Sequence, residues 1–435
     1  MIVVSVFLGL ALDFWTTIGT PRNAAQLSSQ TGAKGVLQQI VLFTIIAGIL
    51  IPAWIVFSSV GRARVQESRP RLAQWRLAGA SPWQVGSAIL LQSVAMAFLA
   101  SLVGWSIAVP LSGWSTRAIF LATDIRVDLD PAFGLPSLVL TVAISLGASA
   151  LGALQPAIRA SRIPPAEALR EATQQQPRIS PFRWVAFGVT IMASIGLAYS
   201  VATASGNGTA STETILLGVL LLIDAAWVAP RFIPWAIARW TSLVRPRGSS
   251  WFLARHAAIA YSDIAVATVM PFAVAGGLLG TYFGAAATWS SSTGQVAGTL
   301  DRLEQQGLVL FLPALVIALA GSIASIFTAA RRRSRETALL VSLGAPGGAL
   351  GIQPLLEGLI FALTSLLIGL LVSTLATFIY SIALATHGAR WNPTIAWMPQ
   401  AAFAAAALIV SWLALQTSAQ PATSVSTREL LSKDA

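Results

Sequence analysis

The chain is built from long runs of apolar residues separated by short polar segments. A helix needs roughly 20 mainly apolar residues to cross the hydrocarbon core of a bilayer. The runs do not alternate apolar and polar positions as barrel strands do, so the pattern predicts transmembrane helices. We expect ten of them, at residues 3–19, 38–60, 84–111, 135–157, 184–202, 214–235, 264–287, 308–329, 352–380 and 396–416.

The amino-acid composition narrows the class of protein. The chain has 435 residues, of which 55% are hydrophobic and 10% are charged, whereas about a quarter of the residues in a soluble domain are charged. The formal charge of +11 does not indicate nucleic-acid binding, because the basic residues lie between the apolar runs and not on one face. Cysteine is absent, which excludes disulfides and thiolate chemistry. An all-α polytopic membrane protein is the fold class that remains.

Lys and Arg gather on one side of the expected spans. Of the 27 basic residues, 21 lie in alternate connecting segments and in the C-terminal tail. These basic segments are residues 61–83, 158–183, 231–263 and 330–351, together with the tail from residue 417. Short cytoplasmic loops are enriched in Lys and Arg, so we expect both termini in the cytoplasm.

The sequence indicates an internal duplication. A shift of 265 positions places Gly79-Ala80 on Gly344-Ala345, Gly104 on Gly369 and Gln155-Pro156-Ala157 on Gln420-Pro421-Ala422. The same shift relates the first four spans to the last four, and both sets enter the membrane from the same side, as in a parallel repeat. We expect a first four-helix repeat at 1–170, a linker with two inserted helices at 171–250, and a second four-helix repeat at 251–435.

The loop between the second and third span of each repeat has residues that end one helix and begin the next, as in a tight helical elbow. In the first repeat a basic helical segment stops at Gly79, and glycine tolerates the left-handed backbone that closes a helix. Ser81 then supplies an N-cap, Pro82 a first-turn proline and Gln84 the partner of a capping box. The second repeat has the same plan at residues 331–346.

A short helix held below the bilayer offers a surface for a cytoplasmic partner. One such loop alone is best explained as an ordinary basic loop with good helix-capping residues. Two copies at matching positions, however, favour a docking function. The expected docking residues are Arg71, Trp75, Gly79, Ala80, Ser81 and Pro82 in the first elbow, and Glu336, Leu340, Gly344, Ala345 and Pro346 in the second. Arg71 stands where the second elbow has Glu336, so the two surfaces are expected to be unequal.

These elbows carry a family resemblance. In both, an Arg-rich helix runs into Leu-Ala-Gly-Ala (77–80) or Leu-Gly-Ala (343–345) and a long apolar span follows. Residues 155–170 look like the sequence that follows the last helix of the same module. The chain therefore resembles the FtsX-like (MacB-type) permeases of ABC transporters over both four-helix units, in a duplicated ten-helix form.

The resemblance implies a partner and a transport function. Such permeases pair with a separate ATP-hydrolysing subunit, here two copies, that docks on the cytoplasmic elbows. Its motion would export or extract an amphiphilic substrate, such as an antimicrobial peptide or a lipid, at a bacterial cytoplasmic membrane. Many relatives carry a large extracytoplasmic domain, whereas the corresponding loops here, residues 20–37 and 285–302, are too short to fold one.

We expect no catalysis from the chain itself. The sequence contains neither a G-x-x-x-x-G-K-[ST] phosphate loop nor an H-E-x-x-H motif. It is therefore expected to bind no cofactor and no metal, while ATP and magnesium bind at the partner subunit.

Polar groups within the spans are candidates for a transport path, because they are costly in lipid. Gln92, Asp224 and Glu357 are the clearest. Glu357, near the cytoplasmic end, is better explained by hydrogen bonding at the elbow or by an arginine partner. Asp224 would either contact substrate or pair the fifth and sixth spans. Asp13 is expected near the outer interface.

Two other functions stay open at this point. An ion-coupled secondary transporter would need paired ionisable residues near mid-bilayer, and these are scarce. A non-transporting membrane regulator that relays ATPase motion is the second, and the missing ectodomains weaken it. Before the seventh span, residues 251–257 predict a helical lead-in that has no counterpart before the first span.

Overall fold

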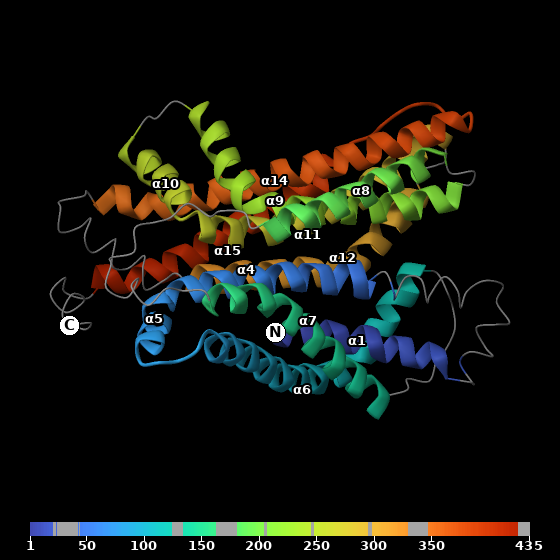
Figure 1. The fold of residues 1–435 in the computed structure, drawn as a ribbon. Coiled ribbons are helices and arrows are strands. Elements are labelled where there is room, and N and C mark those ends of the chain that lie inside the picture. The colour runs from blue at the N-terminus through green and yellow to red at the C-terminus, as the bar shows by residue number, and fades with distance from the viewer. Residues whose placement is uncertain are drawn as a thin grey trace. The chain divides into compact units, whose positions relative to one another are not determined.

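The computed structural model describes residues 1–20, 23, 42, 44–123, 134–161, 181–203, 207–244, 248–294, 298–328 and 347–424, and every regular element within these is helical. The helices are α1 (Ile2–Gly19), the π-helix η1 (Thr44–Leu50), α4 (Ile51–Glu67), α5 (Arg69–Leu77), α6 (Pro82–Thr123), α7 (Leu135–Ser161), α8 (Pro181–Thr203), α9 (Asn207–Ser242), α10 (Ser249–Ala260), α11 (Ser262–Thr293), α12 (Gly298–Thr328), α14 (Gly347–Thr386) and α15 (Trp397–Ser424) (Figure 1). The predicted all-α class is confirmed for these residues.

Nine helices in the described part of the chain are long and apolar enough to cross a membrane. They match nine of the ten expected spans. The remaining span, at 38–60, is represented by η1 and α4, and its described apolar stretch, Gly48–Ser58, is shorter than a membrane crossing. The chain is thus a multi-pass membrane protein, and the tenth span stays a prediction.

The expected loop at 285–302 is largely helical, which corrects the predicted span ends. α11 continues to Thr293 and α12 already begins at Gly298. The polar side chains of this extension are satisfied within the helix, since Ser290, Ser291 and Thr293 donate to backbone carbonyls three or four residues earlier. Serine and threonine can bond in this way inside a helix, so the polar run does not end it.

The helices group into two compact units, each described by itself. Unit 1 consists of Met1–Ser58, Arg69–Glu171 and Ala286–Ala318. Unit 2 consists of Ser59–Ser68, Ala172–Ala285 and Leu319–Ala435.

Unit 1 is built around the mutual packing of α1, α6 and α7. Small residues let these helices approach closely: a Cβ on Gly104 would lie 2.5 Å from the Cβ of Ser5, and a Cβ on Gly9 would lie 3.0 Å from that of Ala108. Ser149 on α7 donates to the carbonyl of Ser93 on α6 at 3.1 Å. Such small residues and interhelical hydrogen bonds are what holds helices together where lipid removes the hydrophobic driving force.

Unit 2 repeats this style of packing with α11, α14 and α15. A Cβ on Gly280 would lie 2.9 Å from the Cβ of Ser373, and one on Gly369 would lie 3.1 Å from the backbone nitrogen of Gly277. The buried amide of Gln400 donates to the Ser373 hydroxyl at 2.9 Å. In addition, α8, α9 and α10 pack against α14.

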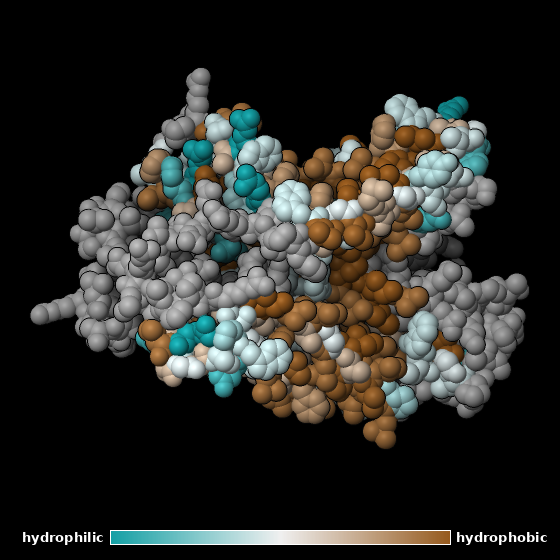
Figure 2. Space-filling view, in the orientation of Figure 1, coloured by the Kyte–Doolittle hydropathy of each residue, from teal (hydrophilic) through white to brown (hydrophobic). Residues whose placement is uncertain are grey.

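Hydrophobic and hydrophilic residues gather over different helices on the surface. In Figure 2 the surface over α6 and α7 is mostly hydrophobic, while hydrophilic residues gather over α5 and α10. The apolar faces of α6 and α7 are those of lipid-exposed spans, and α5 and α10 lie outside the long apolar helices in sequence.

Candidate functional site

The first elbow begins where α5 ends. Gly79 has φ of +95°, in the left-handed region. Its N–H donates to the carbonyl of Arg76 at 3.1 Å, and the N–H of Ala80 donates to that of Trp75 at 3.0 Å. This pair of bonds is the Schellman motif. The Arg76 guanidinium adds a bond to the Ala80 carbonyl at 3.0 Å, so the predicted helix stop is confirmed.

α6 starts two residues later with a complete capping box. The backbone N–H of Gln84 donates to the Ser81 hydroxyl at 3.2 Å, and the backbone N–H of Ser81 donates to the Gln84 side-chain carbonyl at 2.8 Å. Pro82 occupies the first helical position. These bonds confirm the predicted capping box, and they fix the direction in which α6 leaves the elbow.

One face of the elbow is anchored and the other is free. Leu72 and Ala73 of α5 are buried, 5% and 1% exposed, and α5 packs on α6. Trp75 and Trp83 expose 52% and 79% of their side chains, and Arg71 is also exposed. The exposed side combines aromatic and cationic groups, which suits a protein partner more than solvent.

The second elbow lies outside the described residues. This applies to Glu336, Leu340, Gly344, Ala345 and Pro346. α14 begins at Gly347, directly after this segment.

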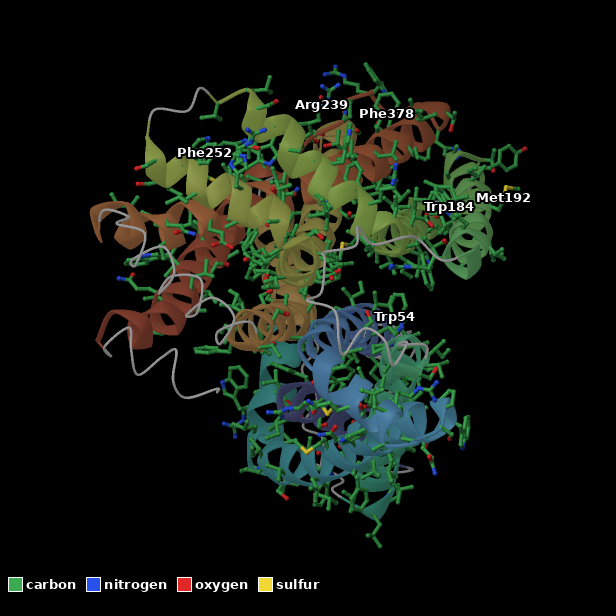
Figure 3. All side chains as sticks on the ribbon, turned by 60° about the vertical axis from the view of Figure 1, so that its left-hand side comes forward. Trp54, Trp184, Met192, Arg239, Phe252 and Phe378 are labelled. Carbon is green, nitrogen blue, oxygen red and sulfur yellow. The ribbon has the colours of Figure 1, made fainter. Side chains whose placement is uncertain are left out.

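A further helix on the basic side precedes α11, as the sequence predicted. α10 covers Ser249–Ala260, including the whole lead-in at 251–257. Arg255 donates to the Thr241 hydroxyl at 3.0 Å and to the Ala238 carbonyl at 3.4 Å. These bonds fasten α10 to the end of α9. Its exposed Phe252 lies over the His256 ring, with ring centroids 4.0 Å apart (Figure 3).

Asp224 joins the two inserted helices. Ser194 on α8 donates to its Oδ2 at 2.7 Å, and Asp224 is 5% exposed. Two further polar ties connect the same helices. Arg183 donates to the Ala226 carbonyl at 3.2 Å, and Ser200 donates to Glu213 at 2.8 Å. Asp224 was expected either to contact substrate or to pair the fifth and sixth spans. The bond from Ser194 is a contact of the second kind.

Sequence reasoning did not identify the role of Arg183. It counted this residue among the basic loop charges, yet the side chain is 3% exposed and its guanidinium carbon lies 6.0 Å from the centre of the Trp227 ring. Its position at the very start of a span, where a long cationic side chain can reach a neighbouring helix end, was the available signal.

Gln92 and Glu357, which correspond under the 265-position shift, have opposite surroundings. Gln92 on α6 is exposed, whereas Glu357 on α14 is 1% exposed. Asp13 on α1 is also 1% exposed. Within unit 2, neither Asp224 nor Glu357 lines the described recess, and Gln92 belongs to unit 1.

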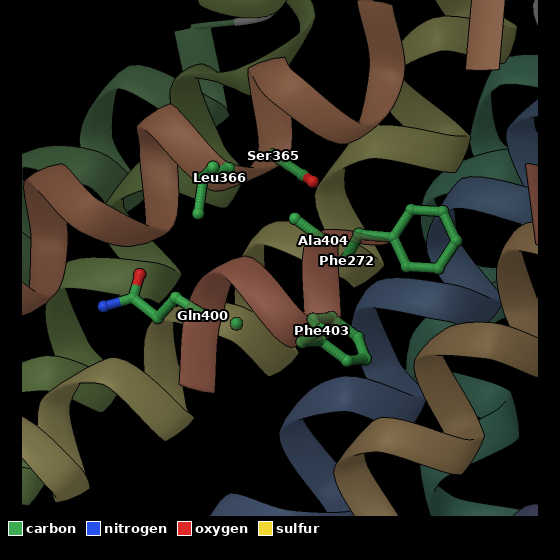
Figure 4. A pocket seen from close by; sticks show the side chains of 7 residues that line it. Phe272, Ser365, Leu366, Gln400, Phe403 and Ala404 are labelled. Atoms are coloured by element: carbon green, nitrogen blue, oxygen red, sulfur yellow. The ribbon is translucent and has the colours of Figure 1, made fainter. Parts of the chain in front are cut away.

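A small recess lies between α11, α14 and α15 in unit 2 (Figure 4). Phe272, Ser365, Gln400 and Phe403 contribute to its lining, and its empty volume is about 170 Å³. Ligand pockets usually measure about 300 Å³ or more. We therefore interpret the recess as a packing gap beside the Gln400 amide and not as a substrate site. No cluster of three metal-ligating side chains occurs in the described part of the chain.

Comparison with known proteins finds a family model that matches the part of the chain containing the first elbow. Residues 40–165 match the family model described as FtsX-like permease C-terminal. The match runs from the start of the second expected span to just beyond α7 and includes the complete first elbow. No curated protein matches the chain. The resemblance predicted from the elbow motifs is thus confirmed over this range.

Proposed function

We propose that this FtsX-like permease is the membrane subunit of an ABC transporter and that a separate cytoplasmic ATPase docks on its elbows. The observation that carries the proposal is the first elbow itself. It lies inside the family match, both of its helix ends are closed by hydrogen bonds, and its aromatic and cationic side chains are exposed.

The elbow is suited to transmit force. The Schellman motif and the capping box give the backbone N–H groups of residues 78–81 and of Gln84 hydrogen-bond partners, which hold the turn between α5 and α6 in one conformation. α6 then continues for 42 residues, about 63 Å at 1.5 Å per residue. A displacement of α5 by a docked ATPase would therefore tilt the whole of α6 and its packed neighbours α1 and α7.

The duplication proposed from sequence has support in the packing of the two units. Gly9 faces the Cβ of Ala108 in unit 1, and Gly280 faces the Cβ of Ser373 in unit 2, where the Gln400 side chain lies closer still. Ala108 and Ser373 are 265 positions apart, as the sequence register requires. Gly9 and Gly280 are 271 positions apart, so the first helix of each repeat would be related by a shift six residues larger.

The same six-residue difference recurs at a second contact. Gly104 meets the backbone of Val6, and Gly369 meets the backbone of Gly277. Val6 and Gly277 are again 271 positions apart. Two contacts one turn apart that share this shift support an equivalent packing of α1 on α6 and of α11 on α14.

A chain with two elbows would dock two ATPase subunits, which would hold the ATP and magnesium. Both termini and the elbows would face the cytoplasm of a bacterium, as the distribution of Lys and Arg predicts. The amphiphilic nature of the substrate is proposed from the family resemblance. Gln92 and Glu357 stay candidates for polar positions along its path.

The test is capture of the tagged protein from its native membrane in mild detergent, with partners identified by mass spectrometry. We expect a P-loop ATPase with the wild type and its loss from the double variant Gly79→Trp, Gly344→Trp. Gly113→Trp is the matched control, because Gly113 lies on α6 with open space around its Cβ position and an ordinary helical backbone. Folded wild-type protein without any ATPase in several detergents would contradict the proposal.

A further inference from the structure

The last turns of α9 leave the direction of the neighbouring spans. Pro230 and Pro234 lie inside this helix, and proline kinks a helix because it removes a backbone hydrogen bond and clashes with the preceding turn. In Figure 1 the part of α9 that follows them turns away from the direction of α8 and α14. We call residues 231–242 the α9 arm. The arm, α10 and α14 all belong to unit 2.

One side of the α9 arm is fixed to unit 2. Ile233, Ile237 and Thr241 recur every four residues, and each is 0% exposed. Trp240 donates to the Thr364 hydroxyl of α14 at 3.0 Å. These contacts hold the arm against α14 and determine which of its sides points away from that helix.

The opposite side of the arm carries Arg231, Trp235 and Arg239, again at intervals of four residues. Side chains with this spacing lie next to one another on a helix. All three are exposed, and Figure 3 shows Arg239 on the outer side of the arm. The rings of Phe232 and Trp235 are in contact, with centroids 5.7 Å apart. The arm thus presents an indole between two guanidinium groups that lie about 12 Å apart along the helix axis.

The charge of this region indicates an anionic partner. Residues 225–262 contain five arginines and neither Asp nor Glu. Trp235 and Leu243 also expose 57% and 84% of their side chains, so the partner has to accept apolar groups as well. Arginine beside tryptophan at the end of a span is typical of the bilayer surface, where rings lie at the level of the lipid head groups and cations meet anionic lipids. The bilayer surrounds the spans of a multi-pass protein, so this partner is already present where α9 ends.

We propose that the α9 arm is a binding site for anionic phospholipid, in which Arg231 and Arg239 hold phosphate groups and Trp235 lies among the head groups. Guanidinium groups bind phosphate through two parallel hydrogen bonds. The site gives the inserted helices a role, because the bond from Trp240 to Thr364 connects the lipid-bound arm to α14. This inference goes beyond the proposed function and does not depend on an ATPase.

The test is titration of phosphatidylglycerol into the purified protein in detergent, with bound lipid counted by native mass spectrometry. We expect the double variant Arg231→Gln, Arg239→Gln to bind the lipid about 25-fold more weakly, since each arginine near a lipid surface contributes about fivefold. Lysine at both positions keeps the charge and should restore most of the affinity. Binding by the wild type should also weaken as salt is raised, more steeply than binding by the double variant.

Arg117→Gln is the matched control. Arg117 is exposed and follows the exposed Trp114 by three residues, but it is the single basic residue of α6. This variant should bind phosphatidylglycerol as the wild type does. Phosphatidylcholine has a zwitterionic head group and should bind equally to the wild type and the double variant. Thermal unfolding in detergent would verify that each variant is folded.

Equal affinity of the wild type and the double variant for phosphatidylglycerol would overturn the proposal. So would an equal loss in Arg117→Gln, or displacement of the lipid by inorganic phosphate at constant ionic strength. If the double variant keeps its lipid affinity but no longer captures an ATPase from the native membrane, the surface belongs to the ATPase and the lipid site is refuted.

Discussion

α6 and α14 occupy equivalent places in the proposed repeats, and their first-helix partners differ in how tightly they approach. A Cβ on Gly104 would lie 2.5 Å from a side-chain atom and 2.9 Å from backbone atoms of α1, whereas one on Gly369 would lie 3.1 Å from the nearest atom of α11. Where α11 has Gly284 against Thr377, the 271-position shift places the buried Asp13 of α1. One packing scheme thus tolerates different side chains at its outer end, while the glycine contact at its centre is retained.

The comparison also separates what each unit contributes. α14 is covered by the inserted helices, and α6 is not. The insert therefore turns one unit into a helix bundle with a buried third span and leaves the third span of the other open to lipid or to a partner chain. We expect unit 2 to be the more rigid of the two.

The largest effect is expected from filling the tighter glycine contact. Gly104→Ala should destabilise the protein by about 3 kcal/mol, because overpacking here pushes against backbone and not against a flexible side chain. Gly369→Ala should cost about 1 kcal/mol. Thermal unfolding in detergent would compare the two, and equal losses would refute the difference between the units.

The next effect concerns the tie between the inserted helices. Ser194→Ala removes the donor to Asp224 and leaves a carboxylate oxygen of a 5%-exposed residue without its partner, at a cost of about 2 kcal/mol. Ser106→Ala is the matched control, since its exposed hydroxyl bonds only within α6. If both variants unfold at the wild-type temperature, the tie does not stabilise the α8–α9 pair.

A smaller loss of stability is expected from a substitution in the first elbow. Gly79→Ala forces a side chain into the left-handed region at a cost of about 1–2 kcal/mol, localised to the end of α5. Hydrogen exchange of the amides of residues 78–80 should accelerate while that of α7 does not. Gly113→Ala, in an ordinary helical position, should leave both unchanged, and faster exchange throughout the chain would indicate global unfolding instead.

The smallest effect is expected where α9 meets α14. Trp240→Phe keeps the aromatic ring but loses the bond to Thr364, worth about 0.6 kcal/mol in a membrane protein. Thr364→Val should give a similar loss, and the double variant should lose no more than either single one. Additive losses in this double-mutant cycle would show that the two side chains do not interact.

Local features of the fold were predictable from sequence, and the surroundings of each helix were not. Gly79, Ser81 and Gln84 act on their own helix ends, so their residue types alone were sufficient to predict the Schellman stop and the capping box. The loop at 285–302 was mispredicted because polar residues such as Ser290 and Thr293 continue α11 beyond its apolar span, with their hydroxyls bonded to carbonyls of the same helix. Gln92 and Glu357 look equivalent along the chain, yet the first is exposed and the second buried, because their helices pack against different neighbours.

The central claim is that each elbow docks one ATPase subunit, and the most direct measurement is the ratio of ATPase to permease in the purified complex by native mass spectrometry. The account predicts two ATPase subunits per permease chain in the wild type, one in Gly79→Trp or Gly344→Trp alone, and none in the double variant. A double variant that keeps the full complement of ATPase would contradict it.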